Sequence, residues 1–289
     1  MNTIESITIG PRPRLRVLHS GQGAPCLFLH GIGGNALNWH RQLETFGRSF
    51  HALAWDVRGY GESEDYEGPF RLEDVSQDIL RVLDHFSYDR AHIVGLSMGG
   101  LIAFDFYTRF PESVLSLTIC SATIGTDALP PEAVQEFLSV RQAPLLSGKE
   151  PYDIAEPVAE GLLGSSVSNE VRQELIESIK ALRKDSYLKT LEAVAHHRID
   201  LAPESITAPV HLVAAGEDKL ITRDDMAYLA ARIKQARFTV IEGAGHVSNI
   251  EKPDEFNDAI LEFLHELSPD EKAGRTGCRV TISGQGRQE

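Results

Sequence analysis

Gly95-Leu96-Ser97-Met98-Gly99 is the stretch from which the rest of this chain can be interpreted. It follows the apolar run Ala91-His92-Ile93-Val94, which is typical of a buried strand, and precedes a helix-like stretch at 101–110. A serine on a sharp turn between a strand and a helix is held in a strained conformation with its hydroxyl exposed. The flanking glycines leave space for that turn, where larger side chains would collide with neighbouring backbone. The pattern therefore predicts that Ser97 is an exposed nucleophile.

Two later strand patterns end in titratable residues. The apolar segment 209–215 runs into Gly216-Glu217-Asp218, and the segment 237–241 runs into Gly243-Ala244-Gly245-His246. Open parallel sheets gather their ligands at the carboxyl ends of strands, so we expect Ser97, Asp218 and His246 to meet there. Imidazole titrates near neutrality and suits a general base, and a carboxylate would fix its orientation and tautomer. The alternative is that Asp218 only caps the following helix and that Glu217 is the carboxylate that orients His246.

A glycine-rich loop follows an earlier strand pattern. The apolar run at 27–29 opens into His30-Gly31-Ile32-Gly33-Gly34. We expect the backbone N–H groups of Ile32 and Met98 to face a developing oxyanion, which would stabilise a transition state. We interpret His30 as a brace for this loop through hydrogen bonds, and not as a group that acts on substrate.

Together these segments resemble the α/β-hydrolase superfamily over roughly residues 15–267, and the stretches at 56–63 and 246–253 add to the likeness. Within it, the chain is most similar to small bacterial carboxylic-ester hydrolases of the 3-oxoadipate enol-lactonase-like group. The resemblance implies an α/β fold with a mostly parallel central sheet, helices on both faces and a helical cap inserted after the sixth strand. It also implies a carboxylic ester hydrolase, an esterase or lactonase, that works through an acyl-Ser97 intermediate with no metal or organic cofactor.

The order of patterns along the chain divides it into four parts. Strand-like and helix-like segments alternate through residue 123 and resume at 206–267, as expected for the core of the fold. The helix-like segments include 39–46 and a stretch in which Leu72, Val75, Ile79, Val82 and Phe86 recur at helical spacing. Residues 124–205 contain only helical patterns, at 133–141, 154–163, 171–182 and 187–196, and are the expected cap. The last 22 residues, 268–289, are rich in glycine, serine and charge, and are predicted to be a disordered tail.

Substrate contacts are expected from Gly31, Trp39, Arg141 and Val247. The cap residue Arg141 is the most specific of these, because a guanidinium can hold a carboxylate through two hydrogen bonds. A solvated arginine on a cap helix is the simpler alternative. Whether the substrate is an ordinary ester or an enol-lactone stays open from the sequence.

The residues at a few positions distinguish this chain from superfamily members that catalyse other reactions. A serine nucleophile excludes relatives that attack with aspartate, such as haloalkane dehalogenases and epoxide hydrolases. Meta-cleavage C–C bond hydrolases typically have bulky tryptophans after the histidine, where this chain has Val247-Ser248-Asn249, and cofactor-free perhydrolases or haloperoxidases usually have an aromatic residue where Ile32 stands. A ligand-binding relative without turnover, an acyltransferase or a hydroxynitrile lyase are the remaining alternatives.

Several other polar residues have structural interpretations. We expect Asp56 and Arg58 to form an ion pair or a turn network. The adjacent His196 and His197 are interpreted as surface or packing residues, since a metal site needs more ligands than one adjacent pair.

Bulk composition narrows the possible partners. With 28 Lys and Arg against 42 Asp and Glu the formal net charge is -14, which argues against nucleic acid. The odd cysteine count (Cys26, Cys120 and Cys278) without metal-like spacing suits a reducing cytoplasm, and no N-terminal signal peptide or membrane-spanning run is recognised. We expect a cytoplasmic monomer or homodimer that binds a small ester or lactone, without a membrane partner.

Overall fold

The computed structural model describes residues 3–125 and 131–267 of the 289-residue chain. The predicted tail at 268–289, with Cys278, and residues 126–130 of the expected cap lie outside the described residues.

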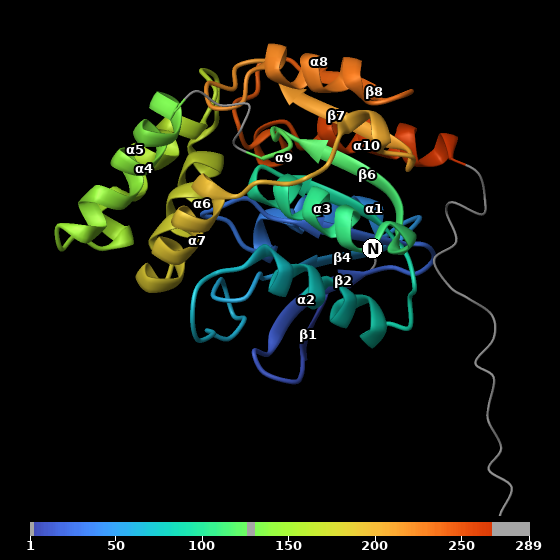
Figure 1. Cartoon of the computed structure of the whole chain (residues 1–289), viewed down its shortest axis with the longest axis horizontal. Helices are drawn as coiled ribbons and strands as arrows, with labels where there is room; N and C mark the ends of the chain where they lie inside the picture. Colours follow the sequence, from blue (N-terminus) through green and yellow to red (C-terminus); the bar gives the residue numbers. More distant parts are fainter. Residues whose placement is uncertain (1–2, 126–130, 268–289) are drawn as a thin grey trace, which may run out of the picture.

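A single sheet of eight strands forms the centre of the molecule (Figure 1), in the order β1-β2-β4-β3-β5-β6-β7-β8. The first two pairings, β1 with β2 and β2 with β4, are antiparallel, and all later neighbours are parallel. The mostly parallel sheet is therefore confirmed. The strands are β1 (Glu5–Ile9), β2 (Leu15–Ser20), β3 (Pro25–Leu29), β4 (His51–Trp55), β5 (Ala91–Leu96), β6 (Val114–Cys120), β7 (Val210–Ala215) and β8 (Arg237–Ile241).

Side chains of the central strands alternate between two hydrophobic cores, one on each face of the sheet. In β3, Leu27 and Leu29 belong to one core, whereas Cys26 and Phe28 belong to the other. This period of two is the geometry of a pleated strand buried on both faces. It explains why these strands are continuously apolar in sequence.

Helices cover both faces, as predicted. The first core is closed by α2 (Leu72–His85), α3 (Met98–Arg109) and α8 (Arg223–Arg232), and the second by α1 (His40–Phe46) and α10 (Pro253–Glu266). The helical spacing predicted for α2 is confirmed for Leu72, Val75, Ile79 and Val82, which are all buried. The fifth member of the stripe, Phe86, is only partly buried and lies just past the end of the helix.

Four α-helices and a short 3-10 helix (Pro203–Ser205) lie between β6 and β7, and no strand occurs among the described residues of that segment. Figure 1 shows the α-helices as one group, coloured green to yellow, beside the sheet. Helix α5 packs on α6, and α4 packs on α7. Their bounds are α4 (Pro131–Leu146), α5 (Pro151–Leu162), α6 (Asn169–Lys180) and α7 (Lys184–His196).

Three local details differ from the sequence-based expectation. The edge strand β1 was not predicted, because its short, largely exposed sequence lacks a buried apolar run. The helix expected over 39–46 is a 3-10 turn at Ala36–Trp39 followed by α1. Helix α4 continues five residues beyond the predicted end at Arg141 and includes Pro144.

Within the described part of the chain, every helix is too short or too polar to span a lipid bilayer.

Candidate active site

Ser97 lies on the turn between the end of β5 and the start of α3. Its φ of 55° and ψ of -118° place a non-glycine residue in a strained backbone region. Close packing explains the glycines on both sides. A Cβ at Gly95 would lie 2.3 Å from the Gly99 carbonyl oxygen, and one at Gly99 would lie 2.0 Å from the Leu29 carbonyl oxygen. The turn therefore requires the sequence Gly-x-Ser-x-Gly.

Asp218 and His246 are brought together from the loops after β7 and β8. Asp218 Oδ2 lies 2.8 Å from His246 Nδ1, and Asp218 Oδ1 accepts hydrogen bonds from the backbone N–H groups of Leu220 and Ile221 at 2.8 and 3.1 Å. Burial alone would raise the pKa of Asp218, but His246 and these N–H donors hold it below its usual range. The carboxylate is thus kept charged beside one ring nitrogen of His246.

Glu217 has a different environment, although it is adjacent in sequence. Its carboxylate accepts hydrogen bonds from the backbone N–H and the hydroxyl of Ser165, at 2.6 and 3.0 Å. It therefore ties a loop of the helical segment to the core and does not contact His246 in the structure. Of the two carboxylates that the sequence offered, the geometry selects Asp218 as the partner of His246.

The loop after β3 packs directly on the Ser97 turn. A Cβ at Gly31 would lie 3.2 Å from Ser97 Cβ, so a side chain at this position would crowd the serine. His30 fastens the loop: its Nε2 accepts a hydrogen bond from the Val57 backbone N–H at 3.1 Å, and its Nδ1 lies 2.8 Å from the Gly31 carbonyl oxygen. Burial lowers the pKa of His30. A neutral ring with its proton on Nδ1 satisfies both contacts, which agrees with a bracing role.

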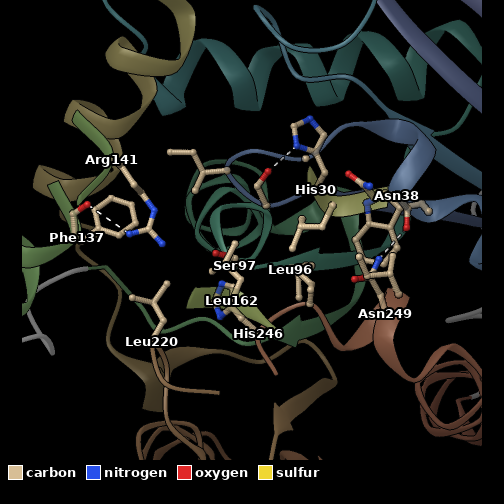
Figure 2. Close-up of a pocket in the computed structure, with 17 residues that line it drawn as sticks. His30, Asn38, Leu96, Ser97, Phe137, Arg141, Leu162, Leu220, His246 and Asn249 are labelled. Atoms are coloured by element: carbon tan, nitrogen blue, oxygen red, sulfur yellow. Dashed lines mark hydrogen bonds between the residues drawn. The ribbon is translucent and has the colours of Figure 1, made fainter. Parts of the chain in front are cut away.

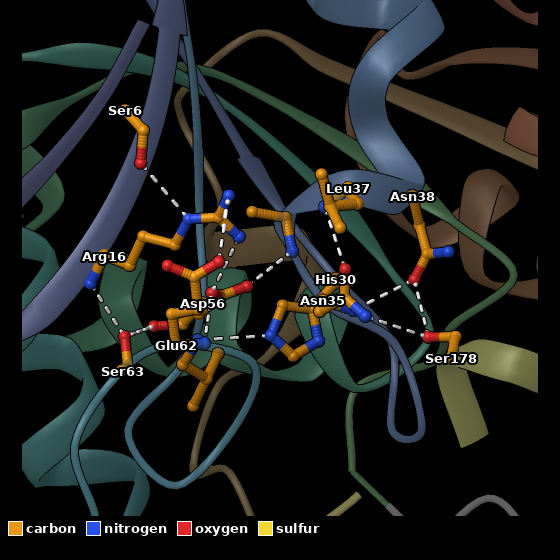
Figure 3. Close-up of polar contacts among 12 residues, drawn as sticks. Ser6, Arg16, His30, Asn35, Leu37, Asn38, Asp56, Glu62, Ser63 and Ser178 are labelled. Carbon is orange, nitrogen blue, oxygen red and sulfur yellow. Dashed lines mark hydrogen bonds and ion pairs between the residues drawn. The ribbon is translucent and has the colours of Figure 1, made fainter. Parts of the chain in front are cut away.

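Asp56 organises the backbone next to this loop (Figure 3). Its carboxylate accepts hydrogen bonds from the backbone N–H groups of Ala36 and Glu62, at 2.7 and 2.8 Å, and pairs with Arg16 at 3.5 Å. Arg58 instead pairs with Asp78 of α2 at 2.7 Å. Both residues have structural contacts, as expected, but with separate partners, because the side chain of Arg58 reaches α2.

Ser97 and His246 line one cavity with about 570 Å³ of empty space, open in part to solvent. Figure 2 shows them between Arg141 and Phe137 at one end and Asn38 and Asn249 at the other. The expected substrate contacts Gly31, Trp39, Arg141 and Val247 line this cavity, and so does Ile32, one of the two expected oxyanion donors. The other lining residues are His30, Gly34, Asn38, Leu96, Phe137, Leu162, Leu175, Leu220, Asn249 and Ile250.

Arg141 is a buried cation in the wall of this cavity, with 8% of its surface exposed. Its guanidinium lies 4.4 Å from the centroid of the Phe137 ring, and Nη1 donates a long hydrogen bond of 3.4 Å to the Phe137 carbonyl oxygen. No carboxylate in the described part of the chain is within ion-pair distance of it, and burial lowers its pKa. The alternative of a solvated arginine is therefore wrong.

The loop that carries His246 is fastened to the helical segment. The His246 backbone N–H donates to the Leu162 carbonyl oxygen at 2.7 Å. Glu251 bridges the same two loops, because its Oε2 accepts from the N–H groups of Gly164 and Gly245 at 2.8 and 3.0 Å. The position of the histidine thus depends on the docking of α5.

A family model described as the alpha/beta hydrolase fold matches residues 25–253. This chain belongs to the α/β-hydrolase fold family. The match covers the Ser97 turn and both loops that carry Asp218 and His246, so the site described above lies within the family's own region.

Individual relatives are similar to this α/β-hydrolase along most of their length. The 3-oxoadipate enol-lactonase 2 of Acinetobacter baylyi is 28% identical over 249 residues, which cover 84% of the chain and 89% of the relative. A protein of Azorhizobium caulinodans that carries the name carbamate hydrolase RutD is 28% identical over 256 residues, which cover 86% of the chain and 93% of the relative. The structure of a thermophilic esterase from Thermogutta terrifontis, solved with malate bound, aligns with a TM-score of 0.80 at 26% identity, over 91% of the chain and 98% of the esterase.

Two polar residues that line the cavity of this α/β-hydrolase were not predicted from the sequence. Asn249 donates from its side-chain nitrogen to the Asn38 carbonyl oxygen at 2.9 Å, and both residues line the cavity. The position of Asn249, three residues after His246, was the available indication. Asn38 offered none, because its role depends on the packing of the turn at Ala36–Trp39.

The other histidines and cysteines of the described residues do not line the cavity. His196 Nδ1 lies 3.0 Å from the Glu192 carbonyl oxygen on the same helix, and His197 Nε2 lies 3.4 Å from Asp105. Cys26 and Cys120 are buried free thiols. No group of three potential metal ligands occurs within residues 3–125 and 131–267.

Proposed function

We propose that this α/β-hydrolase is a serine esterase or lactonase that hydrolyses a carboxylic ester of a small acyl substrate. The observation that carries the proposal is the 2.8 Å contact between Asp218 and His246 Nδ1, in a cavity that Ser97 also lines from a strained turn. The contact occupies Nδ1 and leaves His246 Nε2 as the nitrogen available to a serine hydroxyl. Such an arrangement supports acyl transfer to water.

The reaction would have two balanced halves. Ser97 Oγ attacks the ester carbonyl carbon while its proton passes to His246 Nε2, and the tetrahedral oxyanion accepts hydrogen bonds from the N–H groups of Ile32 and Met98. The C–O bond then breaks, and the same proton goes to the leaving oxygen, which gives acyl-Ser97 and an alcohol. In the second half, water repeats the attack with His246 as base and releases the acid and free Ser97.

Arg141 supports an anionic substrate. Removing a cation from water without a counter-ion is costly, so a buried guanidinium in a cavity wall favours a ligand that brings the missing carboxylate. An enol-lactone that carries a carboxylate is the more specific form of the proposal, and it agrees with the printed name of the Acinetobacter relative. A carbamate is the second candidate, because it appears in the name of an equally similar relative.

The first test compares wild type and Ser97→Ala on short p-nitrophenyl esters, a carboxylate-bearing enol-lactone and a carbamate. We expect ester or lactone hydrolysis by wild type and its loss, by at least about 1,000-fold, in Ser97→Ala. Full activity in Ser97→Ala would overturn the role of Ser97. Turnover of the carbamate alone would replace the ester class by the second candidate.

A second comparison tests Arg141. In Arg141→Gln, we expect hydrolysis of the anionic enol-lactone to fall by about 10- to 100-fold relative to a neutral lactone of similar size, because a charge-assisted hydrogen bond is lost. An equal effect on both lactones would show that Arg141 does not bind the carboxylate.

A further inference from the structure

A second cavity adjoins the first at Ser97. It contains about 700 Å³ of empty space, open in part to solvent, and shares Ile32, Ser97, Phe137 and Leu220 with the first cavity. Its other walls come from α3, from the segment after β6, and from α4, α7 and the loop after β7. They consist of Met98, Leu101, Ser121, Ala122, Thr123, Gly125, Val134, Val194, Ala195 and Ile221.

The two cavities differ in chemistry. None of the described residues that line the second cavity carries a titratable side chain, whereas the first cavity is lined by Arg141, His30 and His246. Two hydroxyls besides Ser97 occur in the second, and neither offers a free polar surface. The Ser121 oxygen is buried, and the Thr123 hydroxyl donates to the Gly125 carbonyl oxygen at 3.0 Å. A ligand group in this space would therefore contact mainly hydrocarbon.

The position of His246 orients an ester across the two cavities. In the proposed reaction, which this step assumes, the leaving oxygen must receive its proton from His246. His246 lines the first cavity and is absent from the walls of the second. The leaving alcohol consequently belongs in the first cavity. Of the two expected oxyanion donors, Ile32 lines both cavities and Met98 lines the second. The ester carbonyl therefore belongs where the two cavities meet at Ser97, and the acyl side points into the second cavity.

We propose that the second cavity is an acyl-chain subsite and that the enzyme prefers esters of apolar, medium-length acids over acetate esters. Each methylene that leaves water for an apolar wall contributes up to about fourfold in kcat/KM. A chain of four additional methylenes in this subsite gives an expected preference on the order of 10- to 100-fold.

The test uses two ester series with opposite variable ends. One series has a constant p-nitrophenol leaving group and acyl chains from acetate to octanoate, and the other has a constant acetyl group and alkyl alcohols from ethyl to octyl. Val194→Phe and Val134→Phe narrow the second cavity from two helices, α7 and α4. Val140→Phe is the matched control, because Val140 lies on α4 with 46% of its surface exposed and lines neither cavity.

We expect both cavity variants to lower the octanoate-to-acetate ratio of kcat/KM by at least about tenfold. Acetate hydrolysis and the alkyl acetate series should change little, and Val140→Phe should resemble wild type. The subsite assignment is wrong if both variants hydrolyse acetate esters with an unchanged octanoate-to-acetate ratio of kcat/KM. It is also wrong if only the alkyl acetate series responds to the two substitutions. In either case the ester hydrolase proposal stands. If wild type hydrolyses no ester in a Ser97-dependent manner, the proposed function itself fails, and the subsite fails with it.

Discussion

Asp218 and Glu217 are adjacent carboxylates that have different partners, which makes them a matched pair for mutation. Asp218→Asn should lower kcat by about 1,000- to 10,000-fold, because an amide no longer fixes the tautomer or stabilises the charged form of His246. Glu217→Gln should leave kcat close to wild type, since Glu217 contacts Ser165. The measurement is ester hydrolysis by both variants, with circular dichroism to verify folding. Comparable loss in both variants would contradict the assignment of Asp218.

At the same scale, the residues predicted from sequence were those whose chemistry depends on local context. Ser97, Asp218 and His246 each follow a strand, so the parallel sheet brings them to one edge before any detail of packing is known. Arg141 differs because its sequence neighbours do not determine whether it faces solvent or the cavity. Its burial against Phe137 depends on how the helical segment docks, which the sequence pattern does not contain.

At the scale of elements, the Ser97 turn depends on the close approach of α3 to β3. Gly99→Ala would place a Cβ 2.0 Å from the Leu29 carbonyl oxygen, so backbone must shift. We expect a loss of unfolding free energy of about 3 kcal/mol or more, with loss of activity. Gly161→Ala is the matched control, because a Cβ there meets no heavy atom within 4 Å and the residue lies inside α5. It should be stabilised by about 0.5–1 kcal/mol in urea unfolding. Equal stability of the two variants would contradict the steric account.

The tie between the histidine loop and the helical segment gives a second prediction at this scale. Glu251 is partly buried and accepts hydrogen bonds from backbone N–H groups of both loops, and burial raises its pKa. Glu251→Gln loses the charge and part of this acceptor capacity, so we expect a loss of stability of about 1–3 kcal/mol and a lower kcat. Glu217→Gln, which removes a tie nearer the surface, should have a smaller effect on both. Thermal unfolding and kcat for the two variants test this, and a stronger effect of Glu217→Gln would contradict it.

Element types were predictable where periodicity was strong. The apolar strands and the amphipathic stripe of α2 follow directly from their spacing. The edge strand β1 lacked such a pattern, since its stability comes from pairing with β2 and not from a buried face of its own. The end of α4 was also missed, because Pro144 lies inside the helix where proline usually marks an end.

For the whole molecule, the arrangement of the core follows from the sequence more fully than the shape of the site. The mostly parallel sheet with helices on both faces follows from local patterns combined with the crossovers of an α/β sheet. The two cavities instead lie where α4, α5, α6 and α7 meet the core, and their walls combine residues as distant as Ile32 and Val194. Such contacts depend on packing angles, which single-chain periodicity does not specify.

The final prediction concerns stability against acid, which depends on histidines buried in the neutral form. His211 lies in β7 with its Nε2 2.9 Å from Thr239 Oγ1 and its ring against Phe263. Burial, with a smaller repulsion from Arg237, lowers its pKa to about 3. Since the unfolded state binds a proton near pH 6.5 and the folded state does not, stability is complete above pH 6.5 and falls as pH decreases toward 3, by about 1.4 kcal/mol per pH unit. His211→Gln keeps a hydrogen-bonding side chain without this titration, so its unfolding free energy should decline less steeply between pH 6.5 and 5, even if the variant is less stable at pH 7. Urea unfolding across that range measures both slopes, and parallel slopes would mean that His211 is already protonated in the folded protein or remains unprotonated in both states.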